Sequence, residues 1–535
     1  VVVLGHFRRG IRLGLTCHRA TSFQPLQPER RRGFFFDPFF DSGDMTRPLV
    51  CETVTAPTTA ELRRKRDGVA DADLVELRLD SVRDPDVAAA LAGRRKPVVV
   101  TCRPTWEGGR FAGSEEDRRR ILGDALSLDA DYVDIEWRAN FGDLIARTGG
   151  RRIVLSSHDF ERMPGDLPSR VRAMRATGAE IVKVAGHAAR LSDCLPLLDL
   201  GGGAGRDGGL VLLAMGERGV ASRVLASRFG SVWTYAGSLG HIGQVSAADL
   251  LGMYRFQAIS TSTAVYGVVG SPIAHSVSPA MHNAAFQDLG VDGVYLPFDA
   301  ADADDFVRFA GAIGLKGASV TIPFKVALAD RVDDADDVAR RIGAINTIRV
   351  ADGRWLATNT DAGGFLRPLQ DRRVPLQGMR VAILGAGGAA RAVAVALAPS
   401  GAHVTVYARD AKRAAPVAMI ASGGVKPWPP EAGSWDLLVN CTPVGIYPHA
   451  NETPIPARLL GGGLVYDLIY NPATTRLLRE AAEAGCETIG GLDMLVAQAV
   501  EQLRWWTGSP PPAGVMRAAA MKRLSECTAD ENYVV

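Results

Sequence analysis

Two hydroxyl side chains, Ser276 and Ser278, stand close together in the segment 270–283, which reads GSPIAHSVSPAMHN. The segment follows an apolar, β-branched run at 264–269 that predicts a strand. Pro279 can begin a helix, because its missing N–H belongs to the unpaired first turn. A loop between this strand and helix could present both hydroxyls to one polyol. A plain strand–loop–helix corner, with Ser278 as the helix cap, is the alternative interpretation.

A glycine-rich turn lies at 380–391, where RVAILGAGGAAR predicts a short buried strand, a turn and a helix. Gly385, Gly387 and Ala390 fit the pattern G-x-G-x-x-[GA]. The glycines of this pattern allow a tight turn and let the backbone approach a pyrophosphate, which the helix N-terminus attracts. The next predicted strand, 402–407, ends about 20 residues later, where such folds read the ribose. Three cationic side chains follow that end: Arg409, Lys412 and Arg413.

Upstream, polar and Ala-rich stretches with helical spacing separate most of eight short β-rich runs. Alternation of strand and helix without a hairpin signal indicates a parallel sheet, and eight units in about 200 residues fit a small (β/α)₈ barrel. The runs are 49–54, 74–77, 98–102, 132–135, 153–155, 181–184, 211–214 and 232–235.

Charged side chains gather where these runs end, which is where barrels of this kind carry their catalytic residues. Strand two ends in Glu76 and Arg78, and strand three ends in Arg103 followed by Glu107. Strand five leads to His158, strand six carries Lys183, and the loop after strand seven is expected to hold Arg223.

The segment 270–283 resembles the substrate-binding signature of shikimate dehydrogenases, and the resemblance covers residues 264–510. It implies that Ser276 and Ser278 hold the shikimate carboxylate and that Lys325 and Asp361 form the catalytic pair. The further matching blocks are GASVTIPFK (317–325), GAINT (343–347), TNTDAGG (358–364), NCTPVG (440–445), DLIYNPATT (467–475) and GGLDMLVAQ (490–498). The other substrate ligands that the resemblance implies are Thr321, Asn346, Tyr470 and Gln498.

The same resemblance implies NADP as the cofactor, with NAD less favoured, and no metal. Arg409 would stack on the adenine and pair with the 2′-phosphate. Two departures bear on this choice, because Ala408 stands where the family usually has Asn and Asp410 adds a negative charge. The implied cofactor-binding residues are Gly385, Gly387, Gly388, Ala389, Arg409, Lys412, Thr442 and Gly445.

The barrel half, residues 48–258, resembles type I 3-dehydroquinate dehydratases. The matching blocks are VELRLD (75–80), TCRPTWEGG (101–109), SSHDF (156–160), IVKVA (181–185), MGERGVASR (215–223) and FGS (229–231). The resemblance implies that Lys183 forms a Schiff base with the ring ketone, that His158 moves the protons and that Glu107 orients the histidine. The implied substrate ligands are Glu76, Arg78, Arg103, Arg223 and Gln244.

The lid segment of the barrel and one residue of the second half also depart from the patterns of these families. The lid segment 235–244 reads YAGSLGHIGQ, about two residues shorter than the family's loop ending Ser-Ala-Pro-Gly-Gln, with Gln244 kept and Ser238 or His241 as substitutes for the family's serine. Ser319 replaces the Asn that usually precedes Val-Thr, and it keeps a small polar side chain there.

These patterns predict an α/β protein with a (β/α)₈ barrel followed by a two-domain shikimate dehydrogenase module. The expected boundaries are a barrel at 45–258, a linker at 259–264, a shikimate-binding domain at 265–375 completed by C-terminal helices at 492–535, and a Rossmann-type domain at 376–491. Residues 1–44 match neither half and are expected to be a disordered tail or a mistranslated extension, with Met45 as the working start.

Composition excludes several classes of function. A net charge of +2 gives no nucleic-acid or membrane signature, and no apolar run reaches the roughly 18 residues of a membrane span. Seven cysteines without paired spacing indicate reduced thiols in a cytoplasm-like compartment, or a plastid if residues 1–44 were a transit segment. No metal cluster is evident in the sequence, and the expected partners are small-molecule substrates and, at most, a second copy of the chain.

The sequence therefore predicts a bifunctional enzyme of aromatic biosynthesis that dehydrates 3-dehydroquinate and reduces the product to shikimate with NADPH. One alternative keeps only the dehydrogenase, acting on shikimate or quinate, beside a degraded barrel. A second alternative is a ligand-sensing regulator built on inactive copies of both domains.

Overall fold

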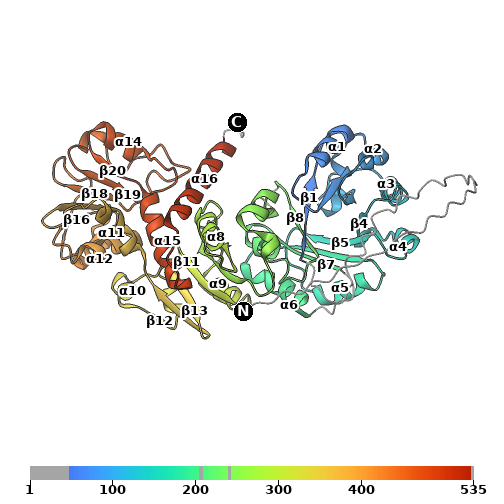
Figure 1. Ribbon diagram of the computed structural model, residues 1–535, viewed down its shortest axis with the longest axis horizontal. Helices are drawn as coiled ribbons and strands as arrows, with labels where there is room; N and C mark the ends of the chain where they lie inside the picture. Colours follow the sequence, from blue (N-terminus) through green and yellow to red (C-terminus); the bar gives the residue numbers. More distant parts are fainter. Residues whose placement is uncertain (1–46, 204–208, 239–241, 532–535) are drawn as a thin grey trace, which may run out of the picture. The chain divides into compact units, whose positions relative to one another are not determined.

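The structure, a computed structural model, describes residues 47–203, 209–238 and 242–531. Its strands form three sheets, one of eight strands and then two of six (Figure 1). The expected extension at residues 1–44 lies outside the described residues, and so do residues 239–241 of the predicted lid.

The first sheet is parallel throughout, in the order β7-β6-β5-β4-β3-β2-β1-β8. Its two ends nearly meet, because the N–H of Val232, just before β8, donates to the carbonyl of Leu210 in β7. The predicted barrel is therefore confirmed. Its strands are β1 (Leu49–Val54), β2 (Leu74–Arg78), β3 (Val98–Thr101), β4 (Tyr132–Glu136), β5 (Ile153–Asp159), β6 (Ile181–His187), β7 (Gly209–Met215) and β8 (Trp233–Ala236). The helices between them are α1 (Thr59–Gly68), α2 (Val87–Leu91), α3 (Glu115–Ser127), α4 (Gly142–Thr148), α5 (Leu167–Arg175), α6 (Leu195–Gly203) and α7 (Val220–Val224).

The barrel strands are apolar on both faces, as a parallel sheet covered by helices requires. Every residue of β7, which reads GLVLLAM, is buried. Inside the barrel, Val99, Val154, Val211 and Trp233 belong to one packed cluster. Polar side chains that follow this cluster, such as Ser156 after Val154 on β5, therefore lie on a packed apolar base at the carboxyl ends of the strands.

The second sheet is mixed, in the order β10-β9-β11-β13-β14-β12. β9, β10 and β11 are parallel to one another, whereas β13 runs antiparallel to both β11 and β14. Its strands are β9 (Ala264–Gly270), β10 (Gly293–Asp299), β11 (Leu315–Val320), β12 (Asp334–Ala335), β13 (Thr347–Ala351) and β14 (Arg354–Thr358). Its helices are α8 (Ser278–Asp288), α9 (Ala303–Ala312), α10 (Asp337–Ile342) and α11 (Asp361–Asp371).

The third sheet is parallel, in the order β17-β16-β15-β18-β19-β20. Numbered from its first strand, this is the order 3-2-1-4-5-6 of a dinucleotide-binding fold. Its strands are β15 (Arg380–Leu384), β16 (His403–Tyr407), β17 (Gly424–Lys426), β18 (Leu437–Asn440), β19 (Leu464–Asp467) and β20 (Glu487–Ile489). Its helices are α12 (Gly388–Leu397), α13 (Ala411–Ile420) and α14 (Arg476–Glu483).

The last two helices, α15 (Gly491–Thr507) and α16 (Ala513–Glu531), pack against elements of the second sheet (Figure 1). Met516 and Ala520 of α16 share a buried cluster with Met281 and Ala285 of α8. The chain thus returns from the dinucleotide-binding sheet to the elements that carry Ser276 and Ser278.

Two predictions about the barrel were wrong in detail. β5 does not end at Leu155 but continues to Asp159, because its ladder with β6 runs on to Gly186, so His158 lies within the strand. Arg223 lies in the short helix α7 and not in a loop, since residues 220–224 complete a helical turn after β7.

The described helices include none that is both long and apolar enough to cross a membrane. Over the same residues, His, Cys, Asp and Glu side chains form no group of three or more that could hold a metal ion.

Candidate active sites

Lys183 projects from the middle of β6 into the carboxyl end of the barrel, and its side chain is 5% exposed. Its Nζ lies 3.1 Å from Oδ2 of Asp134 and 3.7 Å from Oε1 of Glu76. Glu76 accepts further hydrogen bonds from the hydroxyls of Thr53 and Thr101. The lysine is thus a buried cation held by two carboxylates on β2 and β4.

His158 lies on β5, the strand next to that of Lys183, and is paired with Glu107. Oε1 of Glu107 lies 3.0 Å from Nδ1 of His158 and also accepts the backbone N–H of His158 at 2.9 Å. Burial lowers the pKa of His158, and the positive charges of Arg103 and Lys183 lower it further. A neutral imidazole held by Nδ1 leaves Nε2 free to take a proton, which is the requirement for a general base.

Burial also raises the pKa of Glu107 to about 7, although nearby Arg103 opposes the shift. Arg103 is itself almost wholly buried and donates to Asp134 at 2.9 Å, to Glu136 at 2.8 Å and to the hydroxyl of Ser156 at 2.8 Å. The positive charge of Arg103 is therefore already balanced inside the protein. The arginine thus orders the carboxylates around Lys183.

Asp134 and Glu136 are the functional candidates that sequence reasoning missed. Arg103 and Lys183 hold the pKa of Asp134 below its usual range despite complete burial. The sequence signal was present, because β4 reads YVDIE and two carboxylates two residues apart at the end of a strand share one face. Glu136 also accepts from the buried guanidinium of Arg118.

The remaining predicted dehydratase residues lie around the same end of the barrel strands. Arg78 is paired with Asp80 at 2.8 Å. Arg223 donates to the carbonyl of Ile242, and burial lowers the pKa of its guanidinium to about 10. Its Nε has no hydrogen-bond partner within the described part of the chain.

The described part of the lid joins β8 directly. The N–H of Gly237 donates to the carbonyl of Val245, and a Cβ on Gly237 would lie 2.2 Å from Oε1 of Gln244. Glycine at this position therefore lets the Gln244 side chain lie against the backbone that follows β8. Of the two proposed substitutes for the family's lid serine, Ser238 is exposed, and His241 lies outside the described residues.

A second pair of charges stands between β11 and α11. Nζ of Lys325, on the turn after β11, lies 2.5 Å from Oδ2 of Asp361, the first residue of α11. Nδ2 of Asn346 donates to the other oxygen of Asp361 at 2.8 Å. The Lys325 side chain is 21% exposed, so solvent reaches this pair.

Asn346 is itself fixed by a hydrogen-bond network in which Ser319 takes part. The hydroxyl of Thr347 and the N–H of Thr360 donate to Oδ1 of Asn346. Gln502 donates to that Thr347 hydroxyl and accepts from Ser319 at 2.7 Å. The serine that departs from the family pattern is therefore fully bonded.

The predicted substrate ligands of this half come from several elements. Ser276 precedes α8, and its hydroxyl accepts the N–H of Ser278 at 3.3 Å, so the two serines form one turn. Gln498 on α15 lies 3.4 Å from Nδ2 of Asn346. The methyl group of Thr321 lies against Gly270, where a Cβ would be only 2.6 Å away. Tyr470 follows β19, and burial raises the pKa of its phenol.

The glycine-rich turn meets the requirements of a dinucleotide site. Gly385 has φ +108°, a conformation that favours glycine, and a Cβ there would lie 3.2 Å from the carbonyl of Cys441. No side chain caps the N-terminus of α12, so the N–H groups of Gly388 and Ala389 are available to an anion. A Cβ on Gly388 would lie 3.8 Å from Cδ of Lys325, which places this turn beside the charged pair.

The other predicted cofactor residues flank this turn. Thr442 is bonded to Asn440 at the end of β18, and Gly445 has φ +101°. Arg409 and Lys412 are exposed after β16. Asp410 caps α13, because its carboxylate accepts the N–H of Lys412 at 2.9 Å. The negative charge at this position thus has a structural partner.

Three family models match separate parts of the chain. Residues 50–261 match the family model of type I 3-dehydroquinase, residues 268–348 the substrate binding domain of shikimate dehydrogenase, and residues 491–521 the C-terminal domain of shikimate 5′-dehydrogenase. The chloroplastic bifunctional 3-dehydroquinate dehydratase/shikimate dehydrogenase of Arabidopsis thaliana is 35% identical over 503 residues, which are 87% of this chain and 83% of the relative. The chain belongs to this bifunctional family.

Relatives with one activity match the second half of this bifunctional enzyme. A shikimate dehydrogenase (NADP(+)) of Methanothermobacter thermautotrophicus is 41% identical over 281 residues, covering 50% of this chain and 99% of the relative. A solved shikimate 5-dehydrogenase of Thermus thermophilus, in complex with NADP(H) and shikimate, is 37% identical, covers 49% of this chain and 99% of its own, and has a TM-score of 0.46.

The bifunctional enzyme is thus a 3-dehydroquinate dehydratase followed by a shikimate dehydrogenase, a lyase and an oxidoreductase in one chain. Because the match to the Arabidopsis enzyme spans both halves, neither a degraded barrel nor a non-catalytic regulator is favoured.

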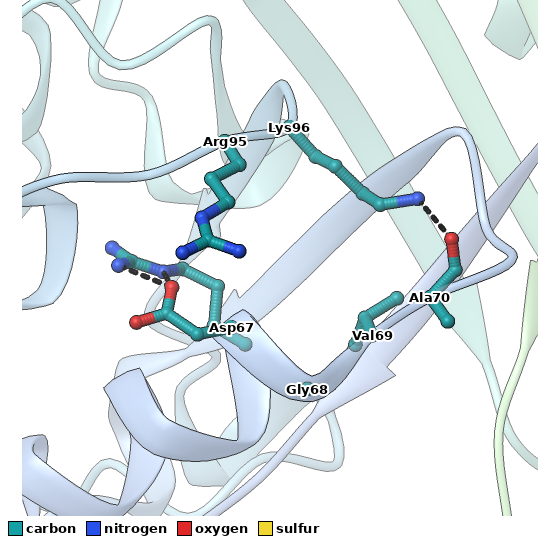
Figure 2. A pocket seen from close by; sticks show the side chains of 7 residues that line it. Asp67, Gly68, Val69, Ala70, Arg95 and Lys96 are labelled. Carbon is teal, nitrogen blue, oxygen red and sulfur yellow. Dashed lines mark hydrogen bonds and ion pairs between the residues drawn. The ribbon is translucent and has the colours of Figure 1, made fainter.

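A hollow of about 310 Å³ lies at the opposite end of the barrel (Figure 2). It is lined by the end of α1, the two residues that follow it and two residues just before β3, and the strand starts are the structural end of such a barrel. Arg66 bonds to Asp67 and to two carbonyls, and Lys96 bonds to the carbonyls of Ala70 and Ala72. Arg66 and Lys96 thus serve the fold, and we do not treat this hollow as a candidate active site.

Proposed function

We propose that Lys183 is the nucleophile of the dehydratase and forms a Schiff base with the ketone of 3-dehydroquinate. The proposal is supported by its burial and by the carboxylates of Asp134 and Glu76, which hold Nζ in one place. A buried site also limits early hydrolysis of the iminium, which water cleaves only after elimination to release the product. The positive iminium then withdraws electrons from the adjacent carbon and makes its proton easier to remove.

His158 is the group that moves this proton in our proposal. Its pKa lies below the usual value, so the ring is neutral near pH 7 and can accept a proton at Nε2. Glu107 holds Nδ1 and fixes which ring nitrogen is free. The protonated histidine then donates to the leaving hydroxyl, and the stabilising charge of Glu107 favours that intermediate.

The substrate is held by the cationic groups at the carboxyl end of the barrel strands. Arg223 is buried with one nitrogen unbonded in the described structure, which suits a substrate carboxylate or hydroxyl. Arg78, Arg103, Glu76 and Gln244 complete the proposed set.

In the second half we assign proton transfer to Lys325 and substrate orientation to Asp361. Reduction of a ketone requires a proton as well as a hydride, and a lysine–carboxylate pair delivers the proton while stabilising negative charge on the oxygen. Asn346 and Gln498 would bind the ring hydroxyls, and Ser276 and Ser278 the carboxylate. Thr321 and Tyr470 complete the proposed ligands.

The cofactor that we propose is NADP, which supplies the hydride when bound. The glycine turn at Gly385 to Ala389 fits the pyrophosphate, since its backbone is open and the first N–H groups of α12 lack a side-chain cap. Thr442 and Gly445 would line the nicotinamide end. Arg409 and Lys412 are free to meet the 2′-phosphate because Asp410 is engaged with the helix backbone.

The observation that carries this assignment is the buried ion pair of Lys183 with Asp134, on the strand next to that of His158, which Glu107 holds. The test uses two variants of the full chain, Lys183→Met and Lys325→Met. Each should lose one activity and keep the other, and a mixture of the two should again convert 3-dehydroquinate and NADPH to shikimate. Borohydride with 3-dehydroquinate should fix an adduct on Lys183 in the unmodified protein. An adduct on another lysine, or none, would remove the Schiff-base assignment.

A further inference from the structure

The aromatic ring of Tyr235 lies against the lysine of the dehydratase site. Tyr235 is on β8, two strands away from the strand of Lys183 in the barrel wall, and is 3% exposed. The Nζ atom of Lys183 stands 4.0 Å from the centroid of its ring. The contact therefore crosses the interior of the barrel, where Tyr235 belongs to the packed cluster that contains Val211 and Trp233.

The ring of Tyr235 is the third group that surrounds Nζ of Lys183, after two carboxylates. Asp134 and Glu76 cover two sides of Nζ, at 3.1 and 3.7 Å. Both carboxylates divide their charge among other donors, since Asp134 also accepts from Arg103 and Ser156 and Glu76 from two threonine hydroxyls. The face of an aromatic ring carries partial negative charge and attracts a cation, most strongly where water is excluded.

The ring of Tyr235 is the part of the side chain that contacts Lys183. The phenol oxygen is buried and has no hydrogen-bond partner in the described structure. Burial also raises the pKa of the phenol, so the side chain stays neutral. Phenylalanine at this position would therefore keep the interaction, whereas an aliphatic side chain would remove it.

We propose that Tyr235 is a catalytic residue of the dehydratase, whose ring stabilises the positive nitrogen of Lys183 in the ammonium and in the iminium that forms from it. In the balanced step, the ammonium of Lys183 first gives one proton to a neighbouring carboxylate, and the free amine then attacks the ketone carbon. That proton and a second one from nitrogen leave with the carbonyl oxygen as water, and a protonated iminium remains. The nitrogen carries one positive charge before and after this change. The inference rests on Lys183 being the nucleophile, as proposed above.

The ring has a particular value at the iminium stage. The iminium nitrogen keeps only one hydrogen, so it makes fewer hydrogen bonds to Asp134 and Glu76 than the ammonium does. Attraction by a ring face does not depend on hydrogen number or direction to the same degree. Loss of the ring should therefore slow the steps that form and use the iminium more than it weakens substrate binding.

The test compares Tyr235→Phe with Tyr235→Leu in the full chain. We expect Tyr235→Phe to keep dehydratase kcat within about twofold, and Tyr235→Leu to lose about tenfold or more in kcat with a smaller change in KM, the size expected for a desolvated cation–π contact. Borohydride trapping on Lys183 should slow in parallel. The dehydrogenase activity of the same chain serves as the internal control.

A graded series separates charge attraction from packing, and it also covers the case in which Tyr235→Leu does not fold. Phenylalanine analogues with increasing ring fluorination at position 235 keep the shape of the ring. Fluorine withdraws electron density and so reduces the partial negative charge on the face of the ring. We expect the logarithm of the trapping rate to fall steadily with fluorination. A flat series, or a Tyr235→Phe protein as slow as Tyr235→Leu, would overturn the role of the ring. Absence of any Lys183 adduct in the unmodified protein would instead overturn the nucleophile assignment.

Discussion

Asp134 connects the two buried cations of the dehydratase site, so its removal tests the electrostatic argument directly. Its side chain is 0% exposed and accepts hydrogen bonds from Lys183, Arg103 and Ser156 at 3.1, 2.9 and 2.6 Å. The substitution Asp134→Asn keeps the size and one carbonyl oxygen but removes the negative charge. The two cations then face each other with less charge between them.

The loss of stability and of kcat in Asp134→Asn depends on the ion pairs that Arg103 and Lys183 keep. Removing one partner of a buried ion pair costs about 3–5 kcal/mol. Arg103 keeps Glu136 at 2.8 Å, and Lys183 keeps Glu76 at 3.7 Å, so the lower figure applies. We expect local stability at β4 and β6 to fall by about 3 kcal/mol. If the same loss falls on the reacting lysine, kcat drops by about a hundredfold.

Three measurements on the full chain check this expectation. Amide hydrogen exchange of peptides from β4 and β6 reports local stability, and dehydratase kcat and borohydride trapping report Lys183. The matched control is Asp129→Asn, the same chemical change in the same barrel at a carboxylate that is 90% exposed. Unchanged kcat and trapping in Asp134→Asn, or equal damage in the control, would refute the role of this charge.

Three further predictions concern the proposed residues. Because the pKa of Glu107 is about 7 and its ionised form accepts the proton-bearing Nδ1 of His158, dehydratase kcat/KM should rise as pH increases through about 7. Glu107→Gln should remove this rise. A flat profile in the unmodified protein, or a rise that persists in Glu107→Gln, would contradict the pairing of Glu107 with His158. Lys325→Ala should mainly lower turnover and Asp361→Asn should impair both binding and turnover, with the dehydratase assay unchanged. Steady-state reduction of 3-dehydroshikimate measures both. Arg409→Ala should weaken NADP about ten- to a hundredfold relative to NAD in titrations, and equal use of both cofactors by the unmodified protein would contradict it.

The barrel and the dinucleotide-binding sheet were predictable because their signals are local. Continuous apolar runs such as VVV at 98–100 predict strands buried on both faces, and glycine spacing at 385–390 predicts the turn. Elements of this kind need no knowledge of distant residues. The exact strand ends are different, because His158 is held in β5 by the ladder with β6, which local sequence does not contain.

The pairing inside the sites was less accessible to sequence reasoning. Asp134 carries a readable signal, a carboxylate at a strand end, yet its partners Lys183 and Arg103 are 49 and 31 residues away. The function of Asp410 was likewise ambiguous until the structure showed its bond to the N–H of Lys412. The role of a charged side chain depends on the residues that it contacts, and tertiary structure decides which residues those are.

The two lysines proposed to take part in catalysis, Lys183 and Lys325, stand in different surroundings, and the difference matches the chemistry proposed for each. The Lys183 side chain is 5% exposed between two carboxylates and an aromatic ring, whereas that of Lys325 is 21% exposed beside one carboxylate. A lysine that forms a covalent iminium is best shielded from bulk water, because the bond must survive until elimination is complete. One water molecule then hydrolyses the product iminium and frees the lysine. A lysine that donates a proton in each turnover must recover one from solvent before the next. Burying Lys325 or opening the site of Lys183 would therefore oppose the reaction that each residue serves.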